Sequence, residues 1–182
     1  MTRIAPLTES SASPEGAQLL SAIKSKLGMV PNLYATIAHA PAALSATLAF
    51  GDALGKASIS APVREQLALA IAGVNTCDYC ASAHTAIGKM NGLDESELNN
   101  NLNARASDPK VQALLTLATD IVESRGNLSE SQISSARSAG VNDTELVEVV
   151  ALVAHNIFTN YINHIAQTEI DFPLVSTQAV CN

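Results

Sequence analysis

The amino-acid sequence predicts an all-α, multihelical protein. Apolar residues recur at spacings of three and four along most of the 182 residues, and patterns typical of strands are nearly absent. Proline, glycine and capping residues interrupt this periodicity repeatedly, as they do at helix ends. The chain has no Trp, three Phe and three Tyr, although 47 % of its residues are hydrophobic. We therefore expect a core of small aliphatic side chains, within one domain spanning residues 1–182.

Helix-start and helix-stop residues divide the first half of the chain into five expected helices. Proline suits the first helical position, because its missing N–H would be unpaired there in any case, and glycine adopts the left-handed conformation that often ends a helix. The five segments are Pro14 to Gly28 after a Ser13 cap, a short helix after Pro31 through Ile37, a helix from Pro41 through Leu54, a helix capped by Ser60 that runs to about Val74, and a helix from about Cys77 to Met90.

The second half of the chain is expected to hold a polar turn and three further helices. Two of these helices begin with a residue pair that resembles a capping box, in which a polar side chain and a Glu or Gln three residues later satisfy each other's backbone N–H groups. The segments are a turn capped by Asp94, a helix from Pro109 to near Gly126, a helix from Ser129 to Gly140, and the longest helix, from about Asp143 to Thr168.

Charge and hydropathy exclude several classes of function. The net charge is −7, the isoelectric point is near 4.9, and the ten Lys and Arg residues are scattered, so nucleic-acid binding is not expected. The longest apolar stretches, such as LALAIAGV, fall well short of the ~20 residues that span a bilayer. The N-terminal segment MTRIAPLTESS lacks the apolar region of a signal peptide. These observations predict a cytoplasmic protein that does not insert into membranes.

One short segment carries most of the chemically reactive residues. Cys77, Cys80 and His84 lie in the stretch CDYCASAHT, and Glu65 precedes them in an otherwise apolar helix. The pattern is E-x11-C-x-x-C-x-x-x-H. Cysteines three apart at a helix start can bring their sulfur atoms within reach of a disulfide. In a reducing compartment such a pair is more often redox-active or metal-binding than a structural disulfide.

The spacing of these four residues suits thiol chemistry. A helix N-terminus stabilises a thiolate and lowers the pKa of a cysteine there. His84 lies one helical turn beyond Cys80, where an imidazole can accept the thiol proton. Glu65 can orient that imidazole and stabilise its cation, because the chain must turn back between the two helices. Together they would relay protons while Cys77 and Cys80 alternate between dithiol and disulfide.

Other interpretations of these residues remain open. Cys77, Cys80 and His84 offer three zinc ligands, but a closed site needs a fourth, from His39, His155 or Glu65. The two thiols can also be inert packing groups. Elsewhere, His39 is expected to close a helix end, and Cys181 is assigned no chemistry. The long final helix carries Asn156, Asn160 and His164 at four-residue spacing, which favours a structural network or subunit contact over catalysis.

Two segments of the chain echo each other at a constant offset. Glu65 aligns with Glu145, and His84 aligns with His164. The cysteines of the first segment have no counterpart in the second. The match raises the possibility of an internal duplication in which only the first copy carries redox chemistry.

The motif resembles the alkylhydroperoxidase AhpD-like group of the carboxymuconolactone decarboxylase superfamily. Beyond the motif, VPNLYATIAHAP before it and NIFTNYINHIAQTEIDFP after it are similar to the peroxidase-related branch of that superfamily. The resemblance covers about Ile4 to Pro173. It implies the multihelical AhpD-like fold, assembly into homo-oligomers such as trimers or hexamers, and no metal or organic cofactor.

The resemblance also implies roles for individual residues. Cys80 would attack the hydroperoxide, Cys77 would resolve the sulfenic acid as a disulfide, and Glu65 and His84 would form the proton relay. An external dithiol or disulfide reductase would then reduce the enzyme. Reasoning from the helix end alone makes Cys77 the more activated thiol instead.

The chain departs from the best-known peroxidase pattern at one position. That pattern has a histidine directly before the second cysteine, where this chain has Tyr79. A phenol with a pKa near 10 cannot act as a base at neutral pH, although it can donate a hydrogen bond to a thiolate or peroxide oxygen. Tyr79 and His164 are therefore secondary candidates for the site.

Thiol-dependent reduction of hydroperoxides is the function that the sequence favours. Two alternatives come from different classes of protein. One is a cofactor-free lyase acting on a lactone acid, which would need no cysteine pair and would suit an anion-binding pocket. The other is a redox-regulated scaffold whose disulfide changes its assembly without turnover.

Overall fold

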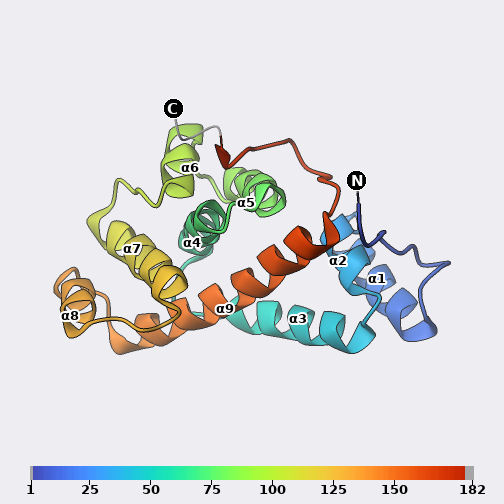
Figure 1. Ribbon diagram of the computed structural model, residues 1–182, viewed down its shortest axis with the longest axis horizontal. Coiled ribbons are helices and arrows are strands. Elements are labelled where there is room, and N and C mark those ends of the chain that lie inside the picture. The colour runs from blue at the N-terminus through green and yellow to red at the C-terminus, as the bar shows by residue number, and fades with distance from the viewer. Residues whose placement is uncertain (1, 179–182) are drawn as a thin grey trace.

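The computed structural model describes residues 2–178, and these form nine α-helices and no strand, so the predicted all-α fold is confirmed. Figure 1 shows their arrangement. The helices are α1 (Pro14–Leu27), α2 (Asn32–Ile37), α3 (Pro41–Leu54), α4 (Ala61–Val74), α5 (Asp78–Met90), α6 (Glu95–Leu102), α7 (Pro109–Ser124), α8 (Glu130–Ser138) and α9 (Asp143–Ala166). Met1 and residues 179–182, including Cys181, lie outside the described residues.

Helix α4 is the central element. It packs against α5, α6, α7 and α9, and these helices surround it in Figure 1. Residues 66–72 of α4 are all buried, so every side of this part of the helix faces protein. A helix that is buried all round is expected to be apolar, which accounts for the run LALAIA, and the buried amide of Gln66 before it donates to Glu97. Glu65 lies immediately before residues 66–72 and is therefore held on a rigid support.

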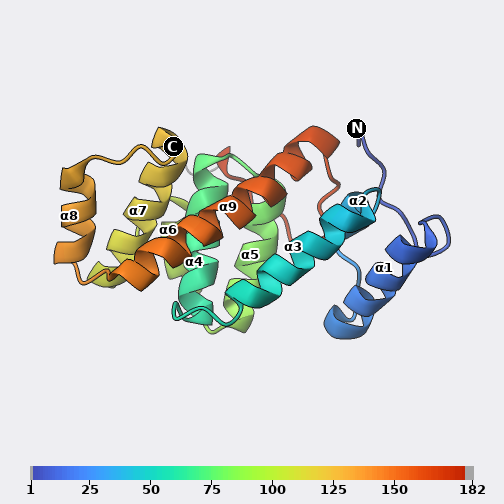
Figure 2. The same cartoon turned by 90° about the horizontal axis from the view of Figure 1, so that it is seen from below.

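The long helix α9 crosses the whole molecule and joins its two hydrophobic clusters. Its N-terminal half packs with α4, α7 and α8, and its C-terminal half lies beside α2, α3 and α5. Figure 2 shows α9 and α3 running along the same face. The cysteine segment belongs to the cluster formed around α1 to α6, with Leu20, Leu44 and Leu69 among its buried members. The candidate chemistry therefore lies inside the core rather than on an exposed loop.

Most predicted helix limits are confirmed, and the capping boxes at Ser129 and Asn142 both form. Two local predictions are wrong. The polar turn after Asp94 is a two-turn helix, α6, because Leu98 and Leu102 pack into the core. Ser60 occupies the cap position of α4 but makes no side-chain capping bond.

Two helix ends lie close to their predicted positions but are formed by other residues. Helix α7 is capped by Arg125, which adopts the left-handed conformation itself, one residue before Gly126. Helix α9 is capped in the same way by Gln167, before Thr168. Non-glycine residues adopt this conformation at a cost, so sequence alone favours Gly126 as the stop of α7.

The echo between the two halves of the sequence does not extend to their shapes. Glu65 and His84 lie on two helices, α4 and α5, that fold back on each other. Glu145 and His164 lie at opposite ends of the single continuous helix α9. Glu145 instead pairs with Lys110 on α7, with 2.7 Å between Oε1 and Nζ. The structure therefore contains no second Glu–His pair at the echoed positions.

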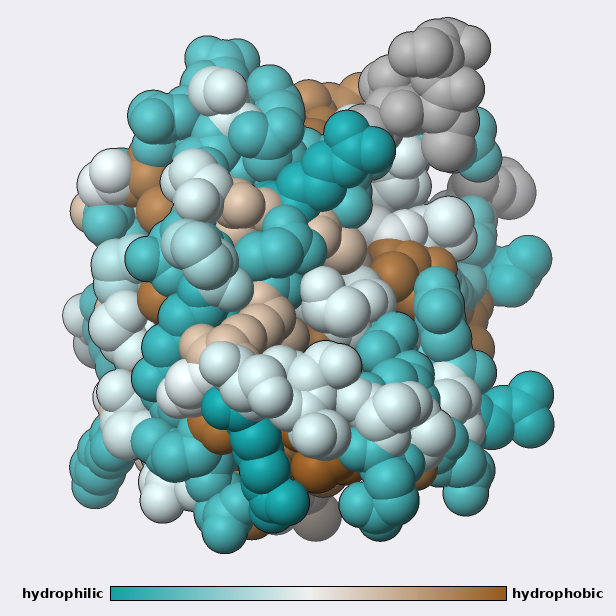
Figure 3. Space-filling model, turned by 90° about the vertical axis from the view of Figure 1, so that its left-hand side faces the viewer, coloured by the Kyte–Doolittle hydropathy of each residue, from teal (hydrophilic) through white to brown (hydrophobic). Residues whose placement is uncertain are grey.

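The outer surface is consistent with the composition. The face at the α8 end is mainly hydrophilic or of intermediate hydropathy, with hydrophobic residues in separate patches (Figure 3). Among residues 2–178, none of the helices combines the length and hydropathy needed to cross a bilayer.

Candidate active site

Cys77 caps the N-terminus of α5. After α4 the chain turns through Asn75 and Thr76, and Thr76 adopts a left-handed backbone conformation with φ of 53°. This turn lets the Cys77 N–H donate to the carbonyl of Ala72, which fixes the cap residue against the preceding helix. The Cys77 sulfur then accepts a hydrogen bond from the backbone N–H of Cys80 at 3.4 Å. A thiol takes the place of the hydroxyl or carboxylate that usually caps a helix.

The two sulfur atoms lie 2.8 Å apart, and the Cys77 thiol donates to the Cys80 sulfur. Both residues are reduced and buried, with exposed fractions of 1 % for Cys77 and 3 % for Cys80. Closing a disulfide, with its bond of about 2.0 Å, needs only a small further approach of the sulfurs. The sequence prediction that this spacing brings the sulfurs together is confirmed by the geometry.

The surroundings of the two cysteines shift their pKa values in opposite directions. The side-chain hydrogen bond with Cys80 lowers the pKa of Cys77, which the Cys80 N–H, Asn163 and the charge of His84 lower further against the opposing effect of burial. The side-chain hydrogen bond with Cys77 and burial both raise the pKa of Cys80 well above its ordinary value, because a second negative charge beside Cys77 is disfavoured. One thiolate shared by the pair therefore resides mainly on Cys77.

His84 and Glu65 form the predicted pair. Nδ1 of His84 lies 2.8 Å from Oε2 of Glu65, across the interface between α5 and α4. Burial lowers the pKa of His84, but the charge of Glu65 and its hydrogen bond outweigh burial, so the pKa is raised overall. The charge on Cys77 raises it further. The raised pKa favours the protonated form of His84, which lies within electrostatic reach of Cys77.

Sequence reasoning missed Asn163 as a functional residue. Its Nδ2 atom, projecting from α9, donates to the Cys80 sulfur at 3.2 Å. Its neighbour one turn earlier, Asn160, accepts a hydrogen bond from Asn75 at 2.8 Å and so ties α9 to the turn before Cys77. The polar stripe was expected to form a structural network, and these contacts confirm one. The only sequence signal for a role at the cysteines is the presence of buried amides in an apolar helix.

Tyr79 does not take the role considered for it from sequence. Its hydroxyl accepts a hydrogen bond from the Leu33 N–H at 3.1 Å, at the first turn of α2. Burial and the neighbouring carboxylate of Asp171 raise its pKa. Its ring packs edge-on against Phe172. Tyr79 therefore joins α5 to α2 and to the segment after α9, and its hydroxyl is directed at the backbone rather than at a sulfur atom.

A pocket of 420 Å³ opens beside Cys77 at the α5 N-terminus. His164, the other secondary candidate, lies in its wall together with Asn163 and Thr168 from the end of α9. Asp78 and Glu169 also line it. The structure thus places His164 near the cysteine pair, at the pocket and on the side of α9, while His84 faces Glu65 on α4.

The segment after α9 fastens the cysteine helix. The N–H and hydroxyl of Thr177 both donate to Oδ1 of Asp78, at 2.8 and 2.6 Å. The Val175 N–H donates to the Ser82 hydroxyl at 2.9 Å. Residues almost one hundred positions apart in sequence therefore hold the first turn of α5 in place.

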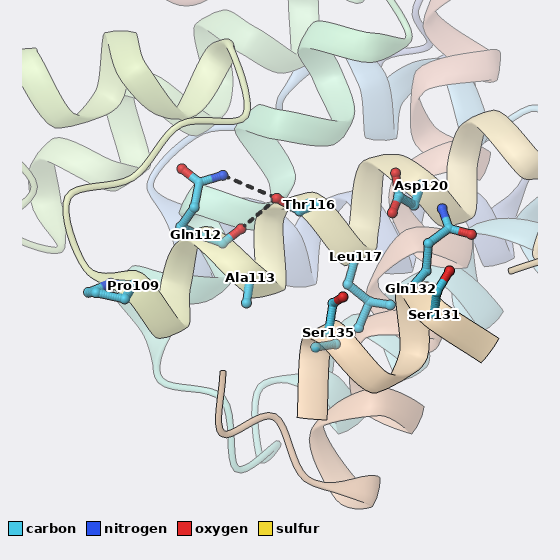
Figure 4. A pocket seen from close by; sticks show the side chains of 10 residues that line it. Pro109, Gln112, Ala113, Thr116, Leu117, Asp120, Ser131, Gln132 and Ser135 are labelled. Carbon is cyan, nitrogen blue, oxygen red and sulfur yellow. Dashed lines mark hydrogen bonds between the residues drawn. The ribbon is translucent and has the colours of Figure 1, made fainter. Parts of the chain in front are cut away.

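A second pocket, of 390 Å³, lies between α7 and α8, away from the cysteines (Figure 4). Gln112 and Thr116 are hydrogen-bonded to each other in its wall. Asp120 is its single titratable side chain among the described residues, so it has no acid–base pair. We assign the chemistry to the pocket beside Cys77.

The other sequence candidates are positioned as follows. His39 hydrogen-bonds through Nε2 to the Ala5 carbonyl and so fastens the N-terminal segment near the end of α2. His155 packs edge-on against Phe50, and burial lowers its pKa. Among residues 2–178 the structure gathers no group of three or more His, Cys, Asp or Glu side chains suited to a metal ion. The zinc interpretation therefore gains no fourth ligand from the candidates that were considered.

Comparison with known proteins agrees with the geometry. Residues 41–108, which contain α3 to α6 and all four motif residues, match the carboxymuconolactone decarboxylase family. None of the curated proteins matches the chain. A solved structure from Ralstonia eutropha JMP134, an uncharacterized peroxidase-related protein described as an alkylhydroperoxidase AhpD core, has 22 % sequence identity and a TM-score of 0.83. The alignment covers 93 % of this chain and 92 % of that one.

Two further structures share the fold. An uncharacterized peroxidase-related protein from Silicibacter sp. TM1040 has 23 % identity and a TM-score of 0.79 over 91 % of both chains. The debrominase Bmp8, in a variant bound to 2,3,4-tribromopyrrole, has 18 % identity and a TM-score of 0.78 over 100 % of this chain and 96 % of that one. The chain therefore shares the all-α AhpD-like fold of these structures, and its residues 41–108 match the carboxymuconolactone decarboxylase family.

Proposed function

We propose that this protein is a thiol-dependent peroxidase that reduces hydroperoxides through the Cys77–Cys80 pair. The observation that carries the proposal is the 2.8 Å approach of the two sulfurs next to the bonded pair of Glu65 and His84. Peroxide reduction needs a thiolate, a second thiol to resolve the sulfenic acid, and a proton donor for the leaving alkoxide. The site contains a group suited to each of these tasks.

The reaction cycle needs a reductant from outside the chain. The hydroperoxide oxidises the dithiol to a disulfide and is itself reduced to an alcohol and water. An external dithiol, or a reductase that carries one, then exchanges with the disulfide and restores both thiols. Glu65 and His84 hold and deliver the proton during both halves of the cycle.

The test counts thiols before and after one equivalent of hydroperoxide. The Cys181→Ser variant serves as the parent protein, because it keeps only the two cysteines of the motif. We expect rapid loss of both thiols, a Cys77–Cys80 disulfide in the mapped peptides, and catalytic consumption of hydroperoxide when a dithiol is supplied. The Cys77→Ser and Cys80→Ser variants should lose catalytic turnover. Turnover that persists in either variant would contradict the proposal.

The same preparation separates the alternatives. A scaffold without turnover would form the disulfide and change its size on a gel-filtration column, but would consume no more than one equivalent of hydroperoxide. A lyase would retain activity on a lactone acid in the Cys77 and Cys80 double variant. Either result would replace the peroxidase assignment.

A further inference from the structure

The pocket beside the cysteine pair is lined by one cysteine and not by the other. Cys77 is part of its lining, together with Thr76, Asn163 and His164, whereas Cys80 is not. The Cys80 sulfur is enclosed by Cys77 and by the amide of Asn163. A molecule that enters this pocket therefore meets Cys77 first, at the N-terminus of α5.

Two buried polar atoms in the pocket wall have no hydrogen-bond partner among the described residues. They are Oδ1 of Asn163 and Oγ1 of Thr168. The exposed fractions of these residues are 5 % and 9 %. An unpaired buried polar atom costs free energy, and such atoms in native proteins often await a ligand or water. Here an acceptor and a hydroxyl lie in the wall that also contains the sulfur, so the pocket suits a small molecule that both donates and accepts hydrogen bonds.

The charge of the lining disfavours anionic molecules. Asp78 and Glu169 contribute carboxylates, and no Lys or Arg is present among the described residues that line the pocket. The first turn of α5 partly offsets this charge, but Cys77 and Asp78 already occupy that helix end. A substrate with its own carboxylate would meet two like charges at the entrance.

We propose that small, uncharged hydroperoxides enter this pocket and that Cys77, not Cys80, is the sulfur they oxidise. The inference rests on the proposed peroxidase function and specifies its substrate class and order of events. It reverses the order that the family resemblance implies. Three observations carry it: Cys77 lines the pocket, its sulfur accepts the backbone N–H of Cys80 and so caps α5, and it lies 2.8 Å from the Cys80 sulfur that would resolve it.

The chemical steps balance with the groups present. The Cys77 thiolate attacks the terminal peroxide oxygen, so that an S–O bond forms, the O–O bond breaks, and two electrons pass from sulfur to the peroxide. The alkoxide leaves as an alcohol with a proton that the His84 and Glu65 pair supplies. Cys80 then attacks the Cys77 sulfur, the S–O bond breaks, and hydroxide leaves as water with the Cys80 proton. An external dithiol reduces the resulting disulfide.

Trapping of the sulfenic acid identifies the oxidised sulfur. In the Cys181→Ser background, the Cys80→Ser and Cys77→Ser variants are treated with one equivalent of tert-butyl hydroperoxide and a cyclic 1,3-dione. We expect the dione adduct on Cys77 in the Cys80→Ser variant, forming at least about tenfold faster than any adduct on Cys80, because reaction follows the thiolate fraction. Faster labelling of Cys80 overturns the order. Failure of the parent protein to form its disulfide overturns the peroxidase function itself.

A charge reversal in the pocket tests the substrate class in protein with both cysteines intact. The parent should have a higher kcat/KM for tert-butyl hydroperoxide than for a hydroperoxide of similar size that carries a carboxylate. Glu169→Lys should reduce this preference by roughly tenfold, since it replaces repulsion of the carboxylate by attraction. Glu130→Lys makes the same charge change on α8 and should leave the preference unaltered. A preference for the anionic substrate in the parent, or one unaffected by Glu169→Lys, overturns the inference.

Discussion

The imidazole of His84 is bound to Glu65 through Nδ1, at 2.8 Å from Oε2. A carboxylate at this nitrogen favours the tautomer with the proton on Nδ1 and leaves Nε2 as the atom that exchanges protons. Helices α4 and α5 are neighbours in sequence and in space, so the pairing depends only on the turn at residues 75–77. The Glu65–His84 pair that we propose as the proton relay therefore lies within one helical hairpin.

Glu65→Gln tests this pairing directly. Loss of the carboxylate removes two of the three effects that raise the pKa of His84, so that burial, the largest effect, lowers it against the charge of Cys77 alone. The His84 pKa measured by NMR titration should fall below its ordinary value of 6.5. Turnover of hydroperoxide should drop by about 10- to 100-fold, as expected for weakened acid–base catalysis. Glu130→Gln, on the exposed side of α8, provides the control, and a His84 pKa that does not move in Glu65→Gln would contradict the relay.

The same pair makes stability depend on pH. The pKa of His84 is higher in the folded protein than its unfolded value of 6.5. Its contribution to the free energy of unfolding is therefore fully present below pH 6.5 and is lost as pH rises through the folded pKa. The difference in unfolding free energy between the parent and His84→Gln, from urea denaturation, should shrink steadily across this range. A difference that grows with pH would have the opposite sign and refute the pairing.

Asn163→Asp tests the contact between α9 and the cysteines. The substitution keeps the shape of the side chain but replaces the N–H donor that faces the Cys80 sulfur with a carboxylate oxygen. A negative charge there opposes thiolate formation, so the thiolate absorbance of the pair should appear at a higher pH, by about one unit or more. Asn127→Asp, on an exposed loop, should leave the titration unchanged. An unaltered thiolate titration in Asn163→Asp would show that this amide does not stabilise the pair.

Two glycine substitutions test how closely α4 is packed. A Cβ atom on Gly73 would lie 2.0 Å from the backbone oxygen of Leu102 at the end of α6, so the helices would have to separate. Gly73→Ala should reduce the free energy of unfolding by about 1–3 kcal/mol or more, which lowers Tm by several degrees. Gly51→Ala, within α3, meets only the His155 ring at 3.5 Å and should be neutral or stabilising by up to about 1 kcal/mol. Equal Tm values for the two variants would contradict the close α4–α6 contact.

The fold and half of the site follow from local sequence signals. Pro14, Pro41 and Pro109 mark helix starts, because proline at a first helical position leaves a pattern that a single sequence shows. The residues from Cys77 to His84 likewise lie within one helix and the turn that precedes it. Helix α6 was missed because its two buried leucines lie among polar residues. Whether a short helix is buried depends on its neighbours, which the local sequence does not show.

The contact of α9 with the cysteines could not be predicted from local sequence signals. Asn163 contacts Cys80 across 83 positions of sequence. Such a contact depends on how two helices cross, and the periodicity of either helix alone does not determine that. Tyr79 illustrates the converse, because its place beside Cys80 in sequence suggests chemistry while its hydroxyl is bound to α2.

The separation of 83 residues between Cys80 and Asn163 also has a consequence during synthesis. At ~5–20 residues per second, a ribosome needs roughly 4–17 s to extend the chain from the cysteine to the amide. During this interval neither the Asn163 carboxamide nor the Thr177 segment has been synthesised, so neither can cover α5. The thiols of the nascent chain are therefore accessible, and in an oxidising cell they would be oxidised before the chain folds and buries them.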